Sequence, residues 1–76
     1  MEKLEITYIG LDSFSRPVYK DVDGKLFVDV DNRKNRNPEI CTKYNNQFEG
    51  EPDTPIQYIE KYKSVNIVFL PKRIVC

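Results

Sequence analysis

Three acidic side chains near the middle of the chain are the first group whose spacing suggests chemistry. Glu49, Glu51 and Asp53 alternate with small or polar residues in the segment FEGEPDTP. Clustered carboxylates can hold a hard cation or act as acid and base. The spacing does not match a helix–loop–helix calcium site, and Thr54 followed by Pro55 is typical of a helix start. We therefore expect a structural role, with no metal and no cofactor.

A nucleophilic thiol is the second chemical possibility, because Cys41 stands beside Thr42 in a polar stretch. The chain has no histidine, so the commonest acid–base group is missing and no base can be assigned to the thiol. Two distant cysteines also supply only half of a tetrahedral zinc site. A chain of 76 residues has little room for a substrate pocket. We predict that the protein is not an enzyme.

An asparagine-rich segment at 31–47, DNRKNRNPEICTKYNNQ, carries the basic side chains that could contact a polyanion. Arg33, Lys34 and Arg36 could bind nucleic-acid phosphates, and Tyr44 offers a ring on which a base can stack. Asparagine favours turns, and no aromatic-interleaved pattern accompanies the charges. A flexible, solvated loop is therefore the simpler interpretation, and nucleic-acid binding is the alternative function.

Composition favours one small domain without a strong electrostatic preference. The chain has 12 basic and 12 acidic side chains, so it lacks the basic excess of most polyanion binders. The first ten residues are charged and alternating, and no stretch reaches the roughly 18–20 apolar residues of a membrane span. We expect a cytoplasmic protein with no membrane contact. Cys41 and Cys76 are then free thiols, and a disulfide would require the loop and the C-terminus to meet.

Alternation of apolar and polar residues predicts the strands. Leu4, Ile6 and Tyr8 share one face of the first strand, and the most apolar run, SVNIVFL, predicts an interior strand beside it. Asp23-Gly24 between two β-prone runs predicts a hairpin. The predicted strands are 3–9, 17–21, 25–30 and 65–70, with a short optional strand at 40–44.

The hairpin allows two registers that differ by one residue. A two-residue loop pairs Tyr19 with Val28, whereas a three-residue loop with Gly24 in the left-handed position pairs Tyr19 with Phe27. A slip of one residue moves every side chain to the other face of the sheet. We favour the three-residue loop, which leaves Val22 as its single apolar residue. In either register Phe27 faces away from Val28.

The segment PIQYIEKY predicts one short helix over residues 55–63. Ile56 and Ile59 share its apolar face with part of Tyr62, and so short a helix must pack on the sheet to be stable. The predicted fold is therefore α+β, a single domain over 1–76 with an antiparallel or mixed sheet of three to five strands and one short helix on a face. The expected core is Leu4, Ile6, Tyr8, Leu26, Val28, Val30, Ile56, Ile59, Val65, Ile67 and Phe69.

A sheet covered by one short helix leaves a second face exposed. We expect Phe27, Val68 and Leu70 on that face, as an apolar patch of the kind that binds other proteins or a second copy of the chain. Phe14 lies in the polar loop LDSFS, where it either folds under the loop or anchors a partner. We therefore predict a small non-enzymatic protein-interaction or accessory module.

Several stretches resemble a domain found on bacterial mobile elements. They are Asp12-Ser13-Phe14, Arg16-Pro17-Val18-Tyr19, Gly24-Lys25-Leu26, Asp29-Val30 and FEGEPDTPI at 48–56. Together they are similar to the large polyvalent protein-associated domains of phages and conjugative elements, with the domain numbered twenty-eight nearest. The resemblance implies a bacterial cytoplasm and an accessory role in element transfer or in evading host defence. It implies no catalytic residues.

Overall fold

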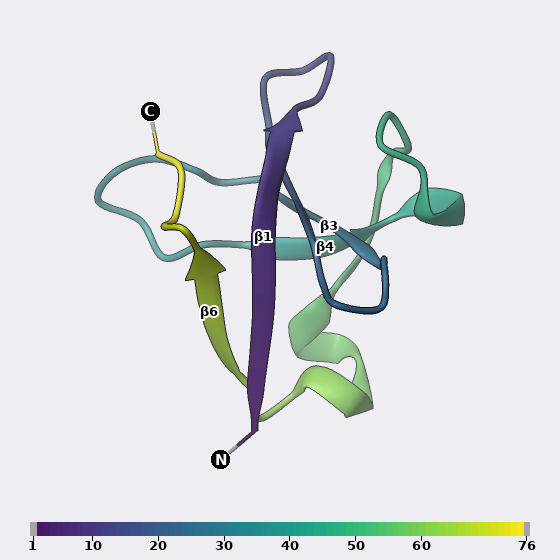
Figure 1. The fold of residues 1–76 in the computed structure, drawn as a ribbon, viewed down its shortest axis with the longest axis vertical. Coiled ribbons are helices and arrows are strands. Elements are labelled where there is room, and N and C mark those ends of the chain that lie inside the picture. Colours follow the sequence, from purple (N-terminus) through teal and green to yellow (C-terminus); the bar gives the residue numbers. More distant parts are fainter. Residues whose placement is uncertain (1, 76) are drawn as a thin grey trace.

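The computed structural model describes residues 2–75, which form one six-stranded mixed sheet (Figure 1). The strands are β1 (Lys3–Leu11), β2 (Pro17–Lys20), β3 (Leu26–Asp29), β4 (Ile40–Lys43), β5 (Pro52–Pro55) and β6 (Asn66–Leu70). Their order in the sheet is β5-β4-β3-β2-β1-β6. Within residues 2–75, β1 and β6 are the only neighbours that run parallel, and the chain crosses from the β5 edge to the opposite edge to form β6. The optional strand at 40–44 is thus present, as β4.

The α+β class predicted from the sequence is wrong, because no α-helix occurs in residues 2–75. In place of the helix over 55–63 are the 3₁₀ turns η2 (Ile56–Tyr58) and η3 (Glu60–Tyr62), separated by extended Ile59. A helix of about two turns gains too few hydrogen bonds to offset its nucleation, and β-branched residues weaken it further. Each turn still buries one apolar side chain of the expected set.

The segment expected to start that helix is instead the edge strand β5. Thr54 precedes Pro55, and a proline ring disfavours helical backbone in the residue before it. The N–H of Thr54 donates to Oγ1 of Thr42 at 3.3 Å, so β5 is tied to β4. Proline at both ends of β5 suits an edge, because proline has no N–H to give to a ladder. With β5 the sheet has six strands, against three to five expected.

The hairpin of β2 and β3 has the three-residue loop that we favoured. Tyr19 pairs with Phe27, and the N–H of Asp21 donates to the carbonyl of Lys25 at 3.0 Å. Gly24 has φ +84°, the left-handed conformation that a glycine adopts without steric conflict. The register prediction is confirmed, and it fixes which side chains of β2 and β3 share a face.

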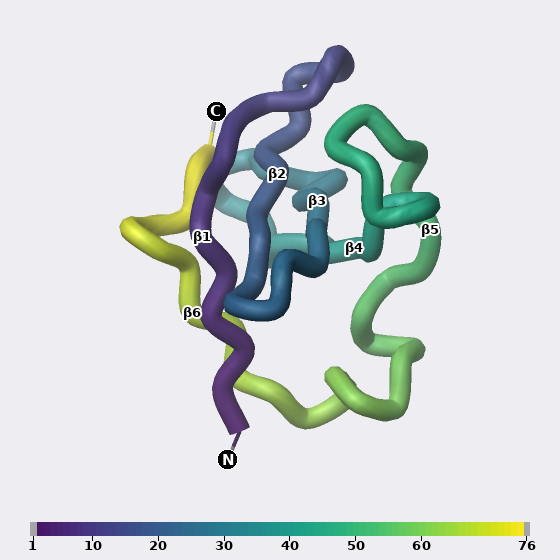
Figure 2. Tube along the Cα trace, turned by 45° about the vertical axis from the view of Figure 1, so that its right-hand side comes forward, coloured from purple at the N-terminus to yellow at the C-terminus, as the bar shows by residue number. Residues whose placement is uncertain are grey.

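The main core lies on one face of a sheet that coils so strongly that β1 runs across β3 and β4 (Figures 1 and 2). Tyr19 stands between the rings of Tyr8 and Phe69, with centroids at 6.0 and 5.2 Å in edge-on geometry. Phe27 is 0% exposed and meets the ring of Tyr62 edge-on at 5.7 Å. The prediction that Phe27 lies on an exposed interaction face is therefore wrong.

The opposite face of the central strands is also covered, which the sequence did not indicate. Val18, Val28 and Cys41 form a second buried cluster, and Phe48 packs against it from the segment after β4. Val28 was expected in the main core and lies here instead, while Val30 is exposed. Because both faces of β2 and β3 are buried, alternation in their sequence could not show which face was inside.

Strand β6 pairs with β1 as expected, but it does not lie inside the sheet. Its partner register runs from Lys3 with Asn66 to Thr7 with Leu70, and no strand follows on its other side among the described residues. β2 already occupies the other side of β1, so the apolar run of β6 is left at an edge. Its three middle residues are half-buried and its two ends are exposed.

Candidate interaction surfaces

The loop between β1 and β2, residues 12–16, is organised around the carboxylate of Asp12. Its Oδ1 accepts hydrogen bonds from the N–H groups of Phe14 and Arg16 at 2.9 and 3.0 Å. Its Oδ2 accepts one from Nε of Arg16 at 3.0 Å. Ser15 has φ +61°, a conformation that a non-glycine residue keeps only where its surroundings enforce it. Asp12 therefore holds this loop, which we call the Phe14 loop, in one conformation.

Lys43 completes this arrangement from β4, a strand 31 residues away in sequence. Its Nζ lies 2.7 Å from Oδ2 of Asp12, and both side chains are 0% exposed. The same Nζ donates to the carbonyl of Gly50 at 3.0 Å. Burial acts to raise the pKa of Asp12, but hydrogen bonds from Lys43 and Arg16 outweigh it and lower that pKa to about 2. The carboxylate is ionised at neutral pH and pins the loop to the sheet.

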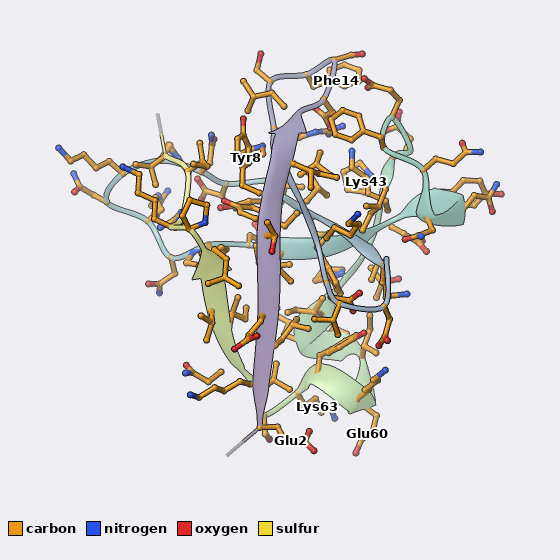
Figure 3. The ribbon with its side chains drawn as sticks, in the orientation of Figure 1. Glu2, Tyr8, Phe14, Lys43, Glu60 and Lys63 are labelled. Carbon is orange, nitrogen blue, oxygen red and sulfur yellow. The ribbon has the colours of Figure 1, made fainter. Side chains whose placement is uncertain are left out.

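Phe14 is presented to solvent by this fixed loop. Its side chain is 68% exposed, so it does not fold under the loop, and Figure 3 shows it at the end of the molecule that β1 reaches. The guanidinium carbon of Arg16 lies 4.7 Å from the ring centroid, a cation–π contact that supports one side of the ring. Ile9 and Leu11 are also exposed on the same end of β1. These three apolar residues define the Phe14 surface.

The basic loop of residues 31–39 is held by a second buried carboxylate. Oδ1 of Asp29 accepts the N–H groups of Asp31 and Glu39 at 3.0 and 3.1 Å, and closes the two ends of the loop. Arg73 enters from beyond β6, donates to the carbonyls of Arg36 and Asp31 at 2.7 and 3.0 Å, and approaches Asp29 at 3.4 Å. Burial raises the pKa of Asp29, and its hydrogen bonds and Arg73 oppose that rise.

The residues predicted to bind nucleic acid do not come together as one site. Arg33 forms two hydrogen bonds to Asp31 at 2.9 and 3.1 Å, which lower the pKa of that carboxyl group, and Arg36 lies 4.0 Å from it. Tyr44 is exposed, but it follows β4 whereas the basic loop precedes β4, so the two lie at opposite ends of that strand. Lys34 is exposed on the loop. The basic residues therefore lack the expected stacking ring.

The acidic segment at 49–53 and the thiol of Cys41 lie in surroundings that suit a structural role. Glu49 accepts the N–H of Ser13 at 2.9 Å, which ties it to the Phe14 loop. No group of three metal-ligating side chains gathers in residues 2–75. Cys41 is buried, and burial, together with the nearby charge of Glu39, raises the pKa of its thiol. Cys76 lies outside the described residues, and so does the alternative of a disulfide between Cys41 and Cys76.

The two buried carboxylates were not identified as site residues from the sequence. Aspartate in a turn commonly accepts hydrogen bonds from nearby backbone N–H groups, and Asp12 does so from Phe14 and Arg16. Nothing local marks Lys43 as its partner, because lysines are almost never fully buried. Arg73 and Asp29 meet across 44 residues, which no short-range pattern reveals.

Comparisons with known proteins identify no relative. No family model, curated protein or solved structure matches the chain. The resemblance to mobile-element domains therefore stays a prediction, as does the cytoplasmic location. None of the helical segments in residues 2–75 has the length and apolar character needed to cross a membrane.

Proposed function

We propose that this chain is a non-enzymatic protein-interaction module whose anchor is Phe14. The observation that carries the proposal is the pairing of a 68% exposed phenylalanine with a loop fixed by the buried Asp12–Lys43 pair. Aromatic side chains that insert into a pocket of the partner supply much of the binding energy at protein interfaces. A single exposed apolar residue would be common on any protein, but Ile9 and Leu11, at the end of the strand that leads into the loop, are exposed as well.

The rigidity of the loop favours a role of Phe14 in recognising a partner over exposure without function. Binding is weakened by the entropy of ordering loops and side chains, so a loop already fixed before binding gains affinity. The buried pair that fixes it is a poor source of stability, because desolvation offsets much of its Coulomb energy. Asp12 and Lys43 are better explained by the need to hold Phe14 and Arg16 in place.

A protein partner fits this surface better than a nucleic acid does. Nucleic-acid sites combine stacking rings with several free basic groups. Among residues 2–75, the cation that contacts the Phe14 ring is Arg16, and its charge is already paired with Asp12 at 3.0 Å. The neighbours Ile9 and Leu11 are apolar, which suits an apolar pocket on a protein.

The test is capture of the partner by the tagged chain in cells of its own host, followed by quantitative mass spectrometry. We expect Phe14→Ala to reduce the captured partner by about tenfold or more, since loss of an interface anchor costs about 2 kcal/mol. Tyr58→Ala is the matched control, because Tyr58 is an equally exposed aromatic side chain, at 70%, from η2. A partner captured equally by all three chains would refute the role of Phe14.

The proposal extends to an accessory role in a bacterial mobile element, on the strength of the sequence resemblance. The genes beside the coding sequence test this part separately. Neighbours for conjugation or phage packaging would support it, and a metabolic operon would count against it. The interaction role of Phe14 is independent of that outcome.

A further inference from the structure

The most apolar strand of the chain, β6, lies at an open edge of the sheet (Figures 1 and 2). The N–H of Asn66 donates to the carbonyl of Glu2 at 2.8 Å, so residue 66 directs its peptide groups toward β1. Peptide direction alternates along a strand, and Ile67 and Phe69 therefore direct their N–H and C=O groups away from the sheet. β6 contains no charged residue and no proline, the devices with which proteins block such edges.

A hollow of about 180 Å³ lies beside this edge. Val65 and Ile67 line it on the β6 side, and residues 38–40 and 55–57 line it on the side of the opposite sheet edge. The coiled sheet therefore stops short of closing on itself. The lining of the gap combines apolar side chains, among them Ile40 and Ile56, with the polar side chains of Glu39, Gln57 and Lys63. A strand added to β6 would place every second side chain on the face of Ile67, toward this hollow.

Positive charge gathers at one end of β6. Lys72 follows the strand, and Arg73 next to it fastens the loop that carries Lys34. The three arginines there are engaged with Asp29 or Asp31, whereas neither Lys34 nor Lys72 forms an ion pair with a carboxylate of residues 2–75. At the other end of β6 the positive charge of Lys63 is balanced by Glu60, which lies 3.3 Å away.

We propose that the open edge of β6 binds an extended segment of another protein, with apolar side chains in the hollow and acidic residues near Lys34 and Lys72. Backbone hydrogen bonds to Ile67 and Phe69 supply the affinity, and the hollow and the lysines supply the specificity. This site is separate from the Phe14 surface, and neither depends on the other.

A second copy of this chain suits the edge less well. Antiparallel pairing of two β6 strands about Val68 would bring Lys72 of each copy next to Ser64 of the other. Lys63 and Glu60 balance each other at that end, so a second copy offers Lys72 no net negative charge. Lys34 and Lys72 instead attract a strand that carries carboxylates at one end.

The probe is a short capped peptide, Glu-Asp followed by alternating Val and Thr, titrated into the ¹⁵N-labelled chain. We expect the amide signals of Ile67 and Phe69 to shift, and the affinity to fall as salt is raised, because exposed charges are screened. A peptide with Lys-Lys in place of Glu-Asp is expected to bind at least about tenfold more weakly. A peptide N-methylated on the edge that faces β6 is expected not to bind.

Variants of the protein reverse the charge at Lys34 and Lys72, which are not part of the core. The double variant Lys34→Glu and Lys72→Glu is expected to prefer the lysine peptide, while Lys25→Glu, in the hairpin turn, is expected to behave as the wild type. Equal binding of the acidic and basic peptides, or binding of neither, would overturn the proposal. So would a concentration-dependent dimer that protects the Ile67 and Phe69 amides, since a second copy would then occupy the edge.

Discussion

The guanidinium of Arg73 lies 3.4 Å from the carboxylate of Asp29, although 44 residues separate them. Asp29 is 0% exposed at the end of β3, and Arg73 follows the last strand of the chain. The same guanidinium donates to two carbonyls of the basic loop. One side chain thus joins the end of β3, the basic loop and the segment after β6.

Replacement of Arg73 by Ala is expected to lower the free energy of unfolding by about 2 kcal/mol. The change leaves Asp29 buried without its cation, and it also removes two hydrogen bonds to the loop. Urea denaturation measures the loss, and amide exchange is expected to quicken in residues 31–39. Lys72→Ala, one residue earlier, is the control and should change stability by less than about 0.5 kcal/mol. Equal effects of the two changes would contradict the role of Arg73.

Acid is expected to destabilise the protein through Asp12. The pKa of its carboxyl group is about 2 in the folded chain, below the ordinary value of 3.8. A lowered pKa means that the unfolded chain binds the proton first, so this stabilisation is complete above about pH 4 and is lost as pH falls toward 2. We expect a loss of about 2 kcal/mol, since each unit of pKa shift corresponds to about 1.4 kcal/mol. In Asp12→Asn this part of the pH dependence should be absent, as denaturant titrations from pH 5 to 2 would show; an unchanged slope would contradict it.

Lys43→Ala is expected to free the Phe14 loop. It leaves Asp12 buried beside an empty position, which costs about 3 kcal/mol, and it removes the bond to the carbonyl of Gly50. The readout beyond stability is amide exchange at Phe14 and Arg16, which should quicken more than at residues of the hairpin turn. Lys20→Ala, on an exposed position of β2, is the control. Unchanged protection of the Phe14 amide would show that Lys43 does not hold the loop.

Gly50→Ala is expected to distort the turn after β4. A Cβ at this position would lie 2.5 Å from the carbonyl oxygen of Tyr44, a backbone atom that cannot move aside. We expect a loss of about 2 kcal/mol or more, since the turn also supplies the carbonyl that Lys43 contacts. Gly24→Ala meets no atom within 4 Å but has φ +84°, and should cost about 1 kcal/mol. Thermal unfolding of the two variants compares them; a larger loss for Gly24→Ala would contradict this reasoning.

Local patterns predicted the local structure of this chain. Alternation placed Leu4 and Ile6 on the buried face of β1, and the Asp23-Gly24 signal with the residues around it led to the observed register. Thr54-Pro55 carried the signals of a helix start, but these residues are the end of an edge strand. The tie of Thr54 to β4 is a tertiary contact that local capping signals do not contain.

The long-range parts of the fold could not be predicted from one sequence. One cover for the sheet predicts an exposed Phe27 on the face opposite Val28. Both faces are in fact covered, because Phe27 packs in the main core against Tyr62 and Phe48 packs over Val28 on the other face. The apolarity of β6 predicts an interior position, yet the strand lies at an edge of the sheet, where its three middle side chains are half-buried. Asp12 with Lys43 and Asp29 with Arg73 are pairs whose members are each ordinary surface residues when read alone.

¹⁹F NMR of the chain with 4-fluorophenylalanine at position 14 tests whether Phe14 is the anchor of a protein interface. On addition of the captured partner, we expect a shifted resonance that is shielded from a soluble paramagnetic probe. A partner that binds the chain while this resonance keeps its position and its solvent exposure would contradict the claim.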